Sequence, residues 1–240
     1  RQCYTPRRAH VDDNHAWVEV WVDGSWYYMG ACEPESVLNK GWFDEPVKRA
    51  MMVHTRTYGQ YFGTEPVLYR QSNAAMLNLL HHYTRTAELS VTVLDEERKP
   101  VSGADVRFQL YNYAEFYTLL IQKSDPSGQA HMTTGLGDLL IWAFRGDRYG
   151  FAKATVRPGL KIEIVLNHRL GDHFTENIDF TPPVKTTLSP TDPATGTEND
   201  LRSLREDEIR NRYIAGFIDE RQSRNLAVTL EVDADLLWKY

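Results

Sequence analysis

The sequence is poor in cysteine, with Cys3 and Cys32 the two thiols among 240 residues. Two cysteines are too few for a disulfide framework, so they leave the redox compartment open. Long apolar runs are also missing, because no stretch approaches the ~18 residues of a membrane-spanning helix. Basic clusters are scarce in a chain whose formal net charge is -6, and the densest is Pro6-Arg7-Arg8. We therefore expect no nucleic-acid partner, since such proteins usually carry a basic face.

The residues that are present are ordinary for a folded protein, with 42% hydrophobic and 25% charged side chains. A chain of 240 residues can build two modest domains, each with its own core. The sequence begins with Arg1 and shows no signal peptide. We therefore expect a processed product or a fragment of a longer protein.

Four regions differ in their residue pattern. Residues 1–85 are rich in aromatic side chains and short strand-like runs. In residues 86–180, runs of strand length in which apolar and polar residues alternate are separated by turns such as Asp-Pro-Ser-Gly, and this pattern predicts a β-sandwich. Residues 181–197 hold four prolines and predict an extended linker. Residues 198–240 predict a C-terminal helix, packed on its own protein or on a partner. The expected fold class is mainly β with some α.

The stretch from Asn14 to Glu35 predicts a β-hairpin, because Asp23-Gly24 separates two apolar, alternating runs. If Val22 faces Ser25, the pairing continues through Trp21–Trp26, Glu19–Tyr28 and Trp17–Gly30 to His15–Cys32. Side chains alternate along a strand, so His15, Trp17, Glu19 and Trp21 share one face. A histidine opposite a thiol or a carboxylate can act as a base, or it can simply form a hydrogen bond at a strand end.

The residues NHAWVEVWVDGSWYYMGACEPE resemble the hairpin that carries the catalytic His and Asp of the transglutaminase-like superfamily. His15, Trp17 and Glu19 match the first half of that motif, and Glu33 stands in place of the family's Asp before Pro34. The resemblance implies a papain-like β-sheet region and a thiol enzyme that hydrolyses amide bonds or transfers their acyl groups. It assigns His15 as the base and Glu33 as the acid that orients it, with Asn14 and Trp17 in support.

Two departures from the family pattern stand out. Glu33 is one methylene longer than Asp, and it reaches His15 only if a bulge near Gly30 rotates it inward. The family's nucleophile lies on a helix N-terminus before the histidine, but 14 residues precede His15 here. We therefore expect a chain that lacks the N-terminal part of the catalytic domain and is inactive alone, although its parent would act on a protein or peptide. Cys32, or less directly Cys3, is the alternative thiol.

Cofactor and metal sites are not predicted. Cys3, His10, His15 and Cys32 lack the spacing of a zinc site, and His81 and His82 would point to opposite faces of a strand. One set of aromatic residues could line a sugar platform, although such a set more often forms the core of a hairpin. Its members are Trp21, Trp26, Tyr27, Tyr28, Trp42 and Phe43.

The second region resembles the prealbumin-like or Ig-like sandwich of carboxypeptidase regulatory-like domains, through DEERKPVSGADVRF and SDPSGQAHMTT. Such modules are appended to secreted or cell-envelope proteins, so this location is expected by analogy. Two functions therefore compete. The first is a fragment of a transglutaminase-like enzyme, and the second is a non-catalytic module that binds protein or glycan and retains a vestigial triad.

Overall fold

The computed structural model describes residues 1–6, 14–32, 35–112, 114–181 and 183. The linker predicted at 181–197 falls almost wholly outside these residues, and the C-terminal helix predicted at 198–240 lies entirely outside them. Within the described part the protein is mainly β, as the alternation predicted. Among the described residues no helix is long and apolar enough to span a bilayer.

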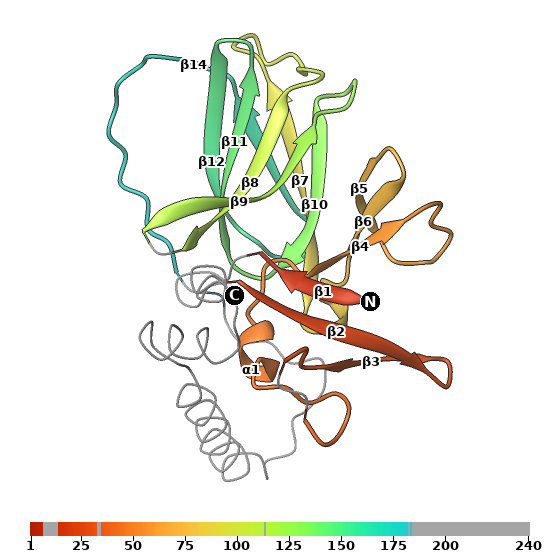
Figure 1. Cartoon of the computed structure of the whole chain (residues 1–240). Helices are drawn as coiled ribbons and strands as arrows, with labels where there is room; N and C mark the ends of the chain where they lie inside the picture. Colours follow the sequence, from red (N-terminus) through yellow and green to blue (C-terminus); the bar gives the residue numbers. More distant parts are fainter. Residues whose placement is uncertain (7–13, 33–34, 113, 182, 184–240) are drawn as a thin grey trace, which may run out of the picture. The chain divides into compact units, whose positions relative to one another are not determined.

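The first 85 residues form one antiparallel sheet with the strand order β3-β2-β1-β4-β6-β5 (Figure 1). Two short helical segments, α1 and η1, accompany it. The elements are β1 (Gln2–Thr5), β2 (His15–Val22), β3 (Ser25–Met29), α1 (Asp44–Val47), β4 (His54–Tyr58), β5 (Val67–Gln71), β6 (Ala74–Asn78) and η1 (Leu80–His82).

The predicted hairpin is confirmed. Strands β2 and β3 pair from Val22↔Ser25 through Trp21↔Trp26 to Val18↔Met29. Asp23 and Gly24 form the two-residue turn with φ of 46° and 80°, as a turn that matches the twist of the strands requires.

The remainder of the expected register is wrong. The β2–β3 ladder ends at Val18↔Met29, because Met29 then bridges to Lys40, so the pair His15–Cys32 does not form. His15 instead faces Thr5 on β1. The β2–β3 pairing shows no register shift up to Met29, and the bulge expected to turn Glu33 inward stays a prediction, because Glu33 lies outside the described residues.

Residues 86–169 form two sheets, β10-β7-β13 and β14-β12-β11-β8-β9. Strand β13 runs parallel to β7, from Leu160↔Leu89 to Val165↔Leu94. The strands are β7 (Thr86–Leu94), β8 (Asp105–Asn112), β9 (Glu115–Lys123), β10 (Gln129–Gly135), β11 (Asp138–Arg145), β12 (Arg148–Thr155), β13 (Leu160–Val165) and β14 (His168–Arg169).

The core between these sheets is aliphatic, and strand alternation produces it. The side chains predicted to be buried are all at most 1% exposed: Leu89, Val91, Val93, Val106, Phe108 and Leu110. The turn at 125–128 forms because the Asp125 carboxylate accepts hydrogen bonds from the backbone N–H groups of Ser127 and Gln129.

The segment before β4 contacts the sandwich directly. Met51 and Met52 belong to the sandwich core, and the Thr134 hydroxyl donates a hydrogen bond to the carbonyl of Met51 at 2.5 Å. At Gly135 a Cβ atom would come within 2.3 Å of the Ala50 carbonyl oxygen, so the close approach needs glycine. The boundary predicted at 85/86 stays a prediction.

Candidate functional site

His15 begins β2 and lies among aromatic rings. Its ring centroid is 4.5 Å from that of Trp42, 5.0 Å from that of Phe43 and 5.8 Å from that of Trp17. Asn14, which precedes it, is exposed. The structure therefore sets His15 at the edge of an aromatic core, and Trp17 lies beside it as predicted.

The other residues predicted for the site are Cys32 and Glu33. Cys32 is exposed and lies in a bend beyond the end of β3. Glu33 lies outside the described residues, so its pairing with His15 stays a prediction. Among the metal ligands weighed from sequence, Cys3 is buried and His10 also falls outside the described part.

Cys3 is unsuited to act as a nucleophile. It is fully buried opposite Trp17, and its Sγ lies 3.8 Å from the hydroxyl of Tyr83. Burial, together with the nearby charge of Glu19, raises the pKa of the Cys3 thiol far above its usual range. Because the thiolate is the reactive form, this thiol stays protonated and inert.

A buried carboxylate, Glu19, lies in the middle of β2. It is 3% exposed and accepts a hydrogen bond from the Tyr83 hydroxyl, while Arg1 Nε lies 2.5 Å from its Oε2. His82 Nδ1 lies 3.5 Å from its Oε1. Burial opposes ionisation, but these donors outweigh it and lower the pKa of Glu19 to about 2. Glu19 is therefore a carboxylate at neutral pH.

Tyr83 connects this carboxylate to the aromatic core. The indole Nε1 of Trp17 donates a hydrogen bond of 2.8 Å to the Tyr83 hydroxyl, which in turn donates to Glu19. Tyr83 is 6% exposed, and its burial raises the pKa of the phenol far above the usual range. The chain Trp17–Tyr83–Glu19–Arg1 satisfies polar groups that burial would otherwise make costly.

An open groove of about 500 Å³ lies over this network. Trp21, Trp26 and Tyr28 supply aromatic walls, because they occupy paired positions on the same face of the hairpin. The Trp21 and Trp26 rings meet edge to face at 5.2 Å, and the Arg1 guanidinium lies 3.9 Å above the Trp26 ring. The polar lining comes from Glu19, Asn39, His82 and Tyr83.

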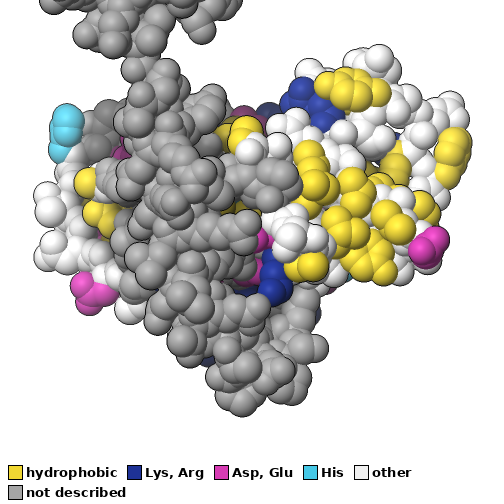
Figure 2. All heavy atoms as spheres, turned by 60° about the horizontal axis from the view of Figure 1, so that its bottom comes forward, with side chains coloured by type: hydrophobic (Ala, Val, Ile, Leu, Met, Phe, Trp, Pro, Cys, Tyr) yellow, Lys and Arg dark blue, Asp and Glu magenta, His cyan; other side chains and the backbone are white. Residues whose placement is uncertain are grey.

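Part of the predicted aromatic platform is thus present. Trp21, at 58% exposure, presents its ring to solvent, whereas Phe43 is completely buried in the core. Figure 2 shows a group of hydrophobic side chains at the right of the view. In Figure 1 the end of the β2–β3 hairpin and the strands β4–β6 lie on this side. An exposed aromatic surface of this kind is typical of a binding site.

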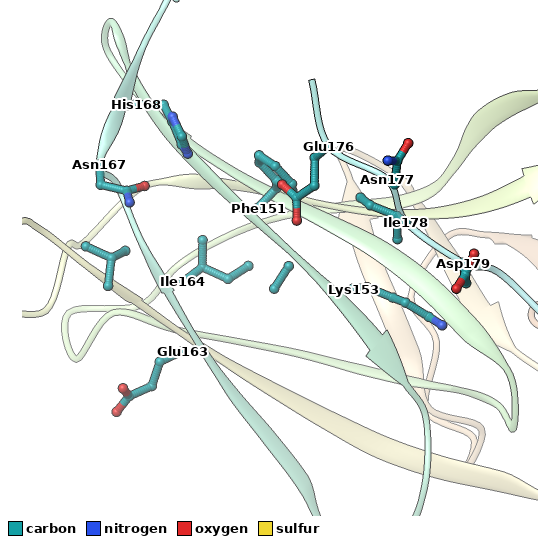
Figure 3. Close-up of a pocket in the computed structure, with 12 residues that line it drawn as sticks. Phe151, Lys153, Glu163, Ile164, Asn167, His168, Glu176, Asn177, Ile178 and Asp179 are labelled. Atoms are coloured by element: carbon teal, nitrogen blue, oxygen red, sulfur yellow. The ribbon is translucent and has the colours of Figure 1, made fainter. Parts of the chain in front are cut away.

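A second hollow, of about 410 Å³, opens on the sandwich between β12, β13 and the segment that follows β14. Figure 3 shows Lys153 and Asp179 at one end and Asn167 and His168 at the other. Lys153 already lies 2.8 Å from the Asp138 carboxylate, so it is held by the protein itself. The groove over Glu19 is therefore the better candidate.

Comparisons with known proteins assign no family. No family model matches the chain, and no curated protein matches it. Similar solved structures include the shaft pilin SpaA of Lactobacillus rhamnosus GG, in its double-mutant form, with 13% identity, a TM-score of 0.26 and coverage of 49% of this chain and 62% of the pilin.

Two further pilins show the same level of similarity. A streptococcal ancillary pilin has 8% identity and a TM-score of 0.28, over 60% of this chain and 42% of its own. The major pilin subunit BcpA of Bacillus cereus has 10% identity and a TM-score of 0.26, over 66% and 40%. The chain spans less than two thirds of each of these pilins, and TM-scores this low assign neither fold nor function.

The transglutaminase-like identification is wrong. No family model matches the chain, that of the transglutaminase-like superfamily included. The described structure agrees, because the first region is a continuous antiparallel sheet whose buried thiol is inert. The expectation that the chain is a fragment of a hydrolase or acyltransferase is therefore wrong as well. A run such as His-x-Trp-x-Glu-Val is also compatible with an ordinary strand whose alternate residues place aromatic side chains on one buried face.

Proposed function

We propose that this chain is a non-catalytic binding module and that the groove over Glu19 binds a carbohydrate. The observation that carries the proposal is the lining of the groove, in which Trp21, Trp26 and Tyr28 stand next to Asn39 and Glu19. Ligand sites of this type combine aromatic area with a few fixed polar groups. Sugars present apolar ring faces that stack on such rings, and hydroxyl groups that bond to amides and carboxylates.

The polar groups of the groove are held in place before a ligand arrives. Asn39 Oδ1 accepts a hydrogen bond of 3.0 Å from the Tyr28 backbone N–H, which fixes the amide beside the hairpin. Glu19 is fixed by Tyr83 and Arg1. Preorganisation of this kind lowers the entropic cost of binding.

The proposal is tested by titrating the full chain with a panel of neutral oligosaccharides, using calorimetry and tryptophan fluorescence. We expect saturable binding that Trp21→Ala weakens about fivefold, since one aromatic stacking contact contributes about 1 kcal/mol. Phe62→Ala is the matched control, because this aromatic is 86% exposed and lies outside the groove lining. The control should bind like the unchanged protein.

Three results would contradict the proposal. Binding that Trp21→Ala and Phe62→Ala weaken equally would place the site elsewhere. Saturable binding of a protein partner, with none of any sugar in the panel, would replace the carbohydrate with a protein ligand. Thiol-dependent turnover of amide substrates by the full chain would contradict the non-catalytic assignment itself.

The proposal includes a secreted or cell-envelope location, and a prealbumin-like or Ig-like topology for the sandwich. What supports both is the resemblance of the second region to sandwich modules that are appended to exported proteins. Fractionation of the source cells with an antibody against the chain tests the location. Recovery in the cytosolic fraction would contradict it.

A further inference from the structure

Two adjacent histidines and a glutamate converge next to the groove. His81 and His82 lie in η1, and Glu65 lies in the loop before β5. The expectation that His81 and His82 point to opposite faces of a strand is wrong, because this segment is a 3₁₀ turn. The turn brings their ring centroids to 4.3 Å, and both rings approach Glu65.

Backbone hydrogen bonds hold these three residues in position. The Asn78 N–H donates to the Pro66 carbonyl at 2.8 Å, which ties the loop after Glu65 to the end of β6. The Asn78 side chain then accepts from the Leu80 N–H at 3.0 Å and so starts the 3₁₀ turn. On the other side, the Glu65 N–H donates to the Tyr61 hydroxyl at 2.9 Å.

The distances between the ligand atoms suit one cation. Glu65 Oε2 lies 3.3 Å from His81 Nε2, and Glu65 Oε1 lies 3.4 Å from His82 Nε2. One ligand atom from each of the three residues lies within 4.8 Å of the others. Bonds of about 2.0–2.1 Å in a tetrahedron place neighbouring ligand atoms about 3.3–3.4 Å apart. Small side-chain rotations therefore complete three corners of a tetrahedron.

We propose that Glu65, His81 and His82 bind a divalent cation of the zinc class, with water at the fourth position. Two imidazole nitrogens and one carboxylate oxygen are the donor set that zinc and its neighbours in the first transition row prefer. Calcium and magnesium prefer oxygen ligands throughout. Side-chain exposures of 45% for His81 and 25% for His82 leave the cation a path from solvent.

The surroundings of the site orient its ligands. His82 Nδ1 faces the Glu19 carboxylate at 3.5 Å, which leaves Nε2 directed at Glu65. Arg1 Nη2 binds Glu65 Oε1 at 3.0 Å, which fixes the orientation of the carboxylate. Partners of this kind behind a histidine and a carboxylate are typical of metal centres.

The test is a titration of the full chain, after treatment with a chelator, with Zn²⁺ followed by calorimetry and with Co²⁺ followed by visible absorption. We expect one cation per chain with micromolar or tighter affinity, and the absorption bands of a nitrogen- and oxygen-bound Co²⁺. Mg²⁺ and Ca²⁺ should give no saturable signal. A rise in thermal midpoint with Zn²⁺ provides an independent measure.

Variants assign the binding to these residues. His81→Ala and Glu65→Gln should each weaken Zn²⁺ binding 10–100-fold, and His81 is exposed enough that its replacement should leave the fold intact. His131→Ala is the matched control, because His131 also pairs with a carboxylate, Glu88, at 3.3 Å but lies on the sandwich. Trp21→Ala should leave Zn²⁺ binding unchanged, which separates this proposal from the carbohydrate groove.

Three results would overturn the proposal. The first is no saturable Zn²⁺ binding below 1 mM, a concentration about a thousandfold above the expected affinity. The second is binding that His81→Ala and Glu65→Gln leave intact. The third is binding that His131→Ala removes.

Discussion

The two hydrophobic cores of the described chain are built from different side chains. The sandwich core is largely aliphatic, with Leu89, Val91 and Ile141 as typical members. The core under the six-stranded sheet gathers rings such as Trp17 and Phe43, and a buried carboxylate lies against it. The aromatic core lies against the buried Glu19 carboxylate, whose hydrogen-bond partners it must hold in fixed positions. The candidate sites accordingly lie over the aromatic core.

The largest expected effect is in the sandwich core. Phe108→Ala should lower the free energy of unfolding by about 4 kcal/mol, because Phe108 is completely buried and its removal leaves a cavity. Denaturant unfolding measured by circular dichroism and by tryptophan fluorescence checks this. Four of the six tryptophans lie within residues 1–85, so fluorescence reports mainly on the first region.

The same variant tests the boundary at 85/86. If the sandwich folds as its own domain, its circular dichroism transition should shift while the fluorescence transition stays in place. One shared transition would contradict independent folding. Ile121→Ala is the control, since Ile121 is 52% exposed and its loss should change stability by less than about 0.5 kcal/mol.

The next largest effect is a pH dependence of the unfolding free energy, caused by His54 in the first region. Burial, and then the charge of Arg56, lower the pKa of His54 to about 4. Between pH 6.5 and pH 4 the unfolded chain binds a proton at His54 that the folded chain does not. Stability is therefore full above pH 6.5, falls as the pH decreases through this window and levels off below pH 4. The loss is about 3 kcal/mol at most.

Unfolding curves of the metal-free protein, taken between pH 4 and pH 8, measure this loss. His54→Gln should flatten the profile relative to the unchanged protein, whereas His131→Gln, on the exposed surface of the sandwich, should not. Equal slopes for the unchanged protein and His54→Gln would show that other groups cause the dependence.

The smallest of the three effects concerns the polar network. Tyr83→Phe removes the hydroxyl that joins Trp17 Nε1 to Glu19, so two buried groups lose a partner. We expect a loss of about 2 kcal/mol in unfolding free energy, within the usual range for an unsatisfied buried group. Tyr58→Phe, at a side chain that is 71% exposed, should have almost no effect. Equal stability of the two variants would mean that the network is not stabilising.

Local patterns predicted the hairpin and the strands of the sandwich correctly. Alternation and turn residues act within a few positions, so Asp23-Gly24 and the segment around Val91 are readable without knowledge of distant partners. The end of the β2–β3 ladder was not readable, because it depends on β1 taking His15 as its neighbour. The family motif was misleading for the same reason, since it describes one strand and not its surroundings.

The polar sites were missed because their members are distant in the sequence. Arg1, Glu65 and Tyr83 meet Glu19 and His82 through the order of strands in the sheet, which sequence periodicity does not specify. One signal was available. Glu19 shares a strand face with Trp17, and a carboxylate that is buried beside a tryptophan needs donors from elsewhere.

The parallel pairing of β7 and β13 has a mechanical consequence. A force applied between Thr86, at the start of β7, and Val165, at the end of β13, acts on these two strands from their opposite ends. Because the two strands are parallel neighbours, this force pulls them in opposite directions along their length and loads their evenly spaced hydrogen bonds together. Such a shear geometry resists stretching more strongly than a hairpin pulled open from one end, where the bonds break one after another. The pairing of β7 with β13 should therefore resist stretching between Thr86 and Val165.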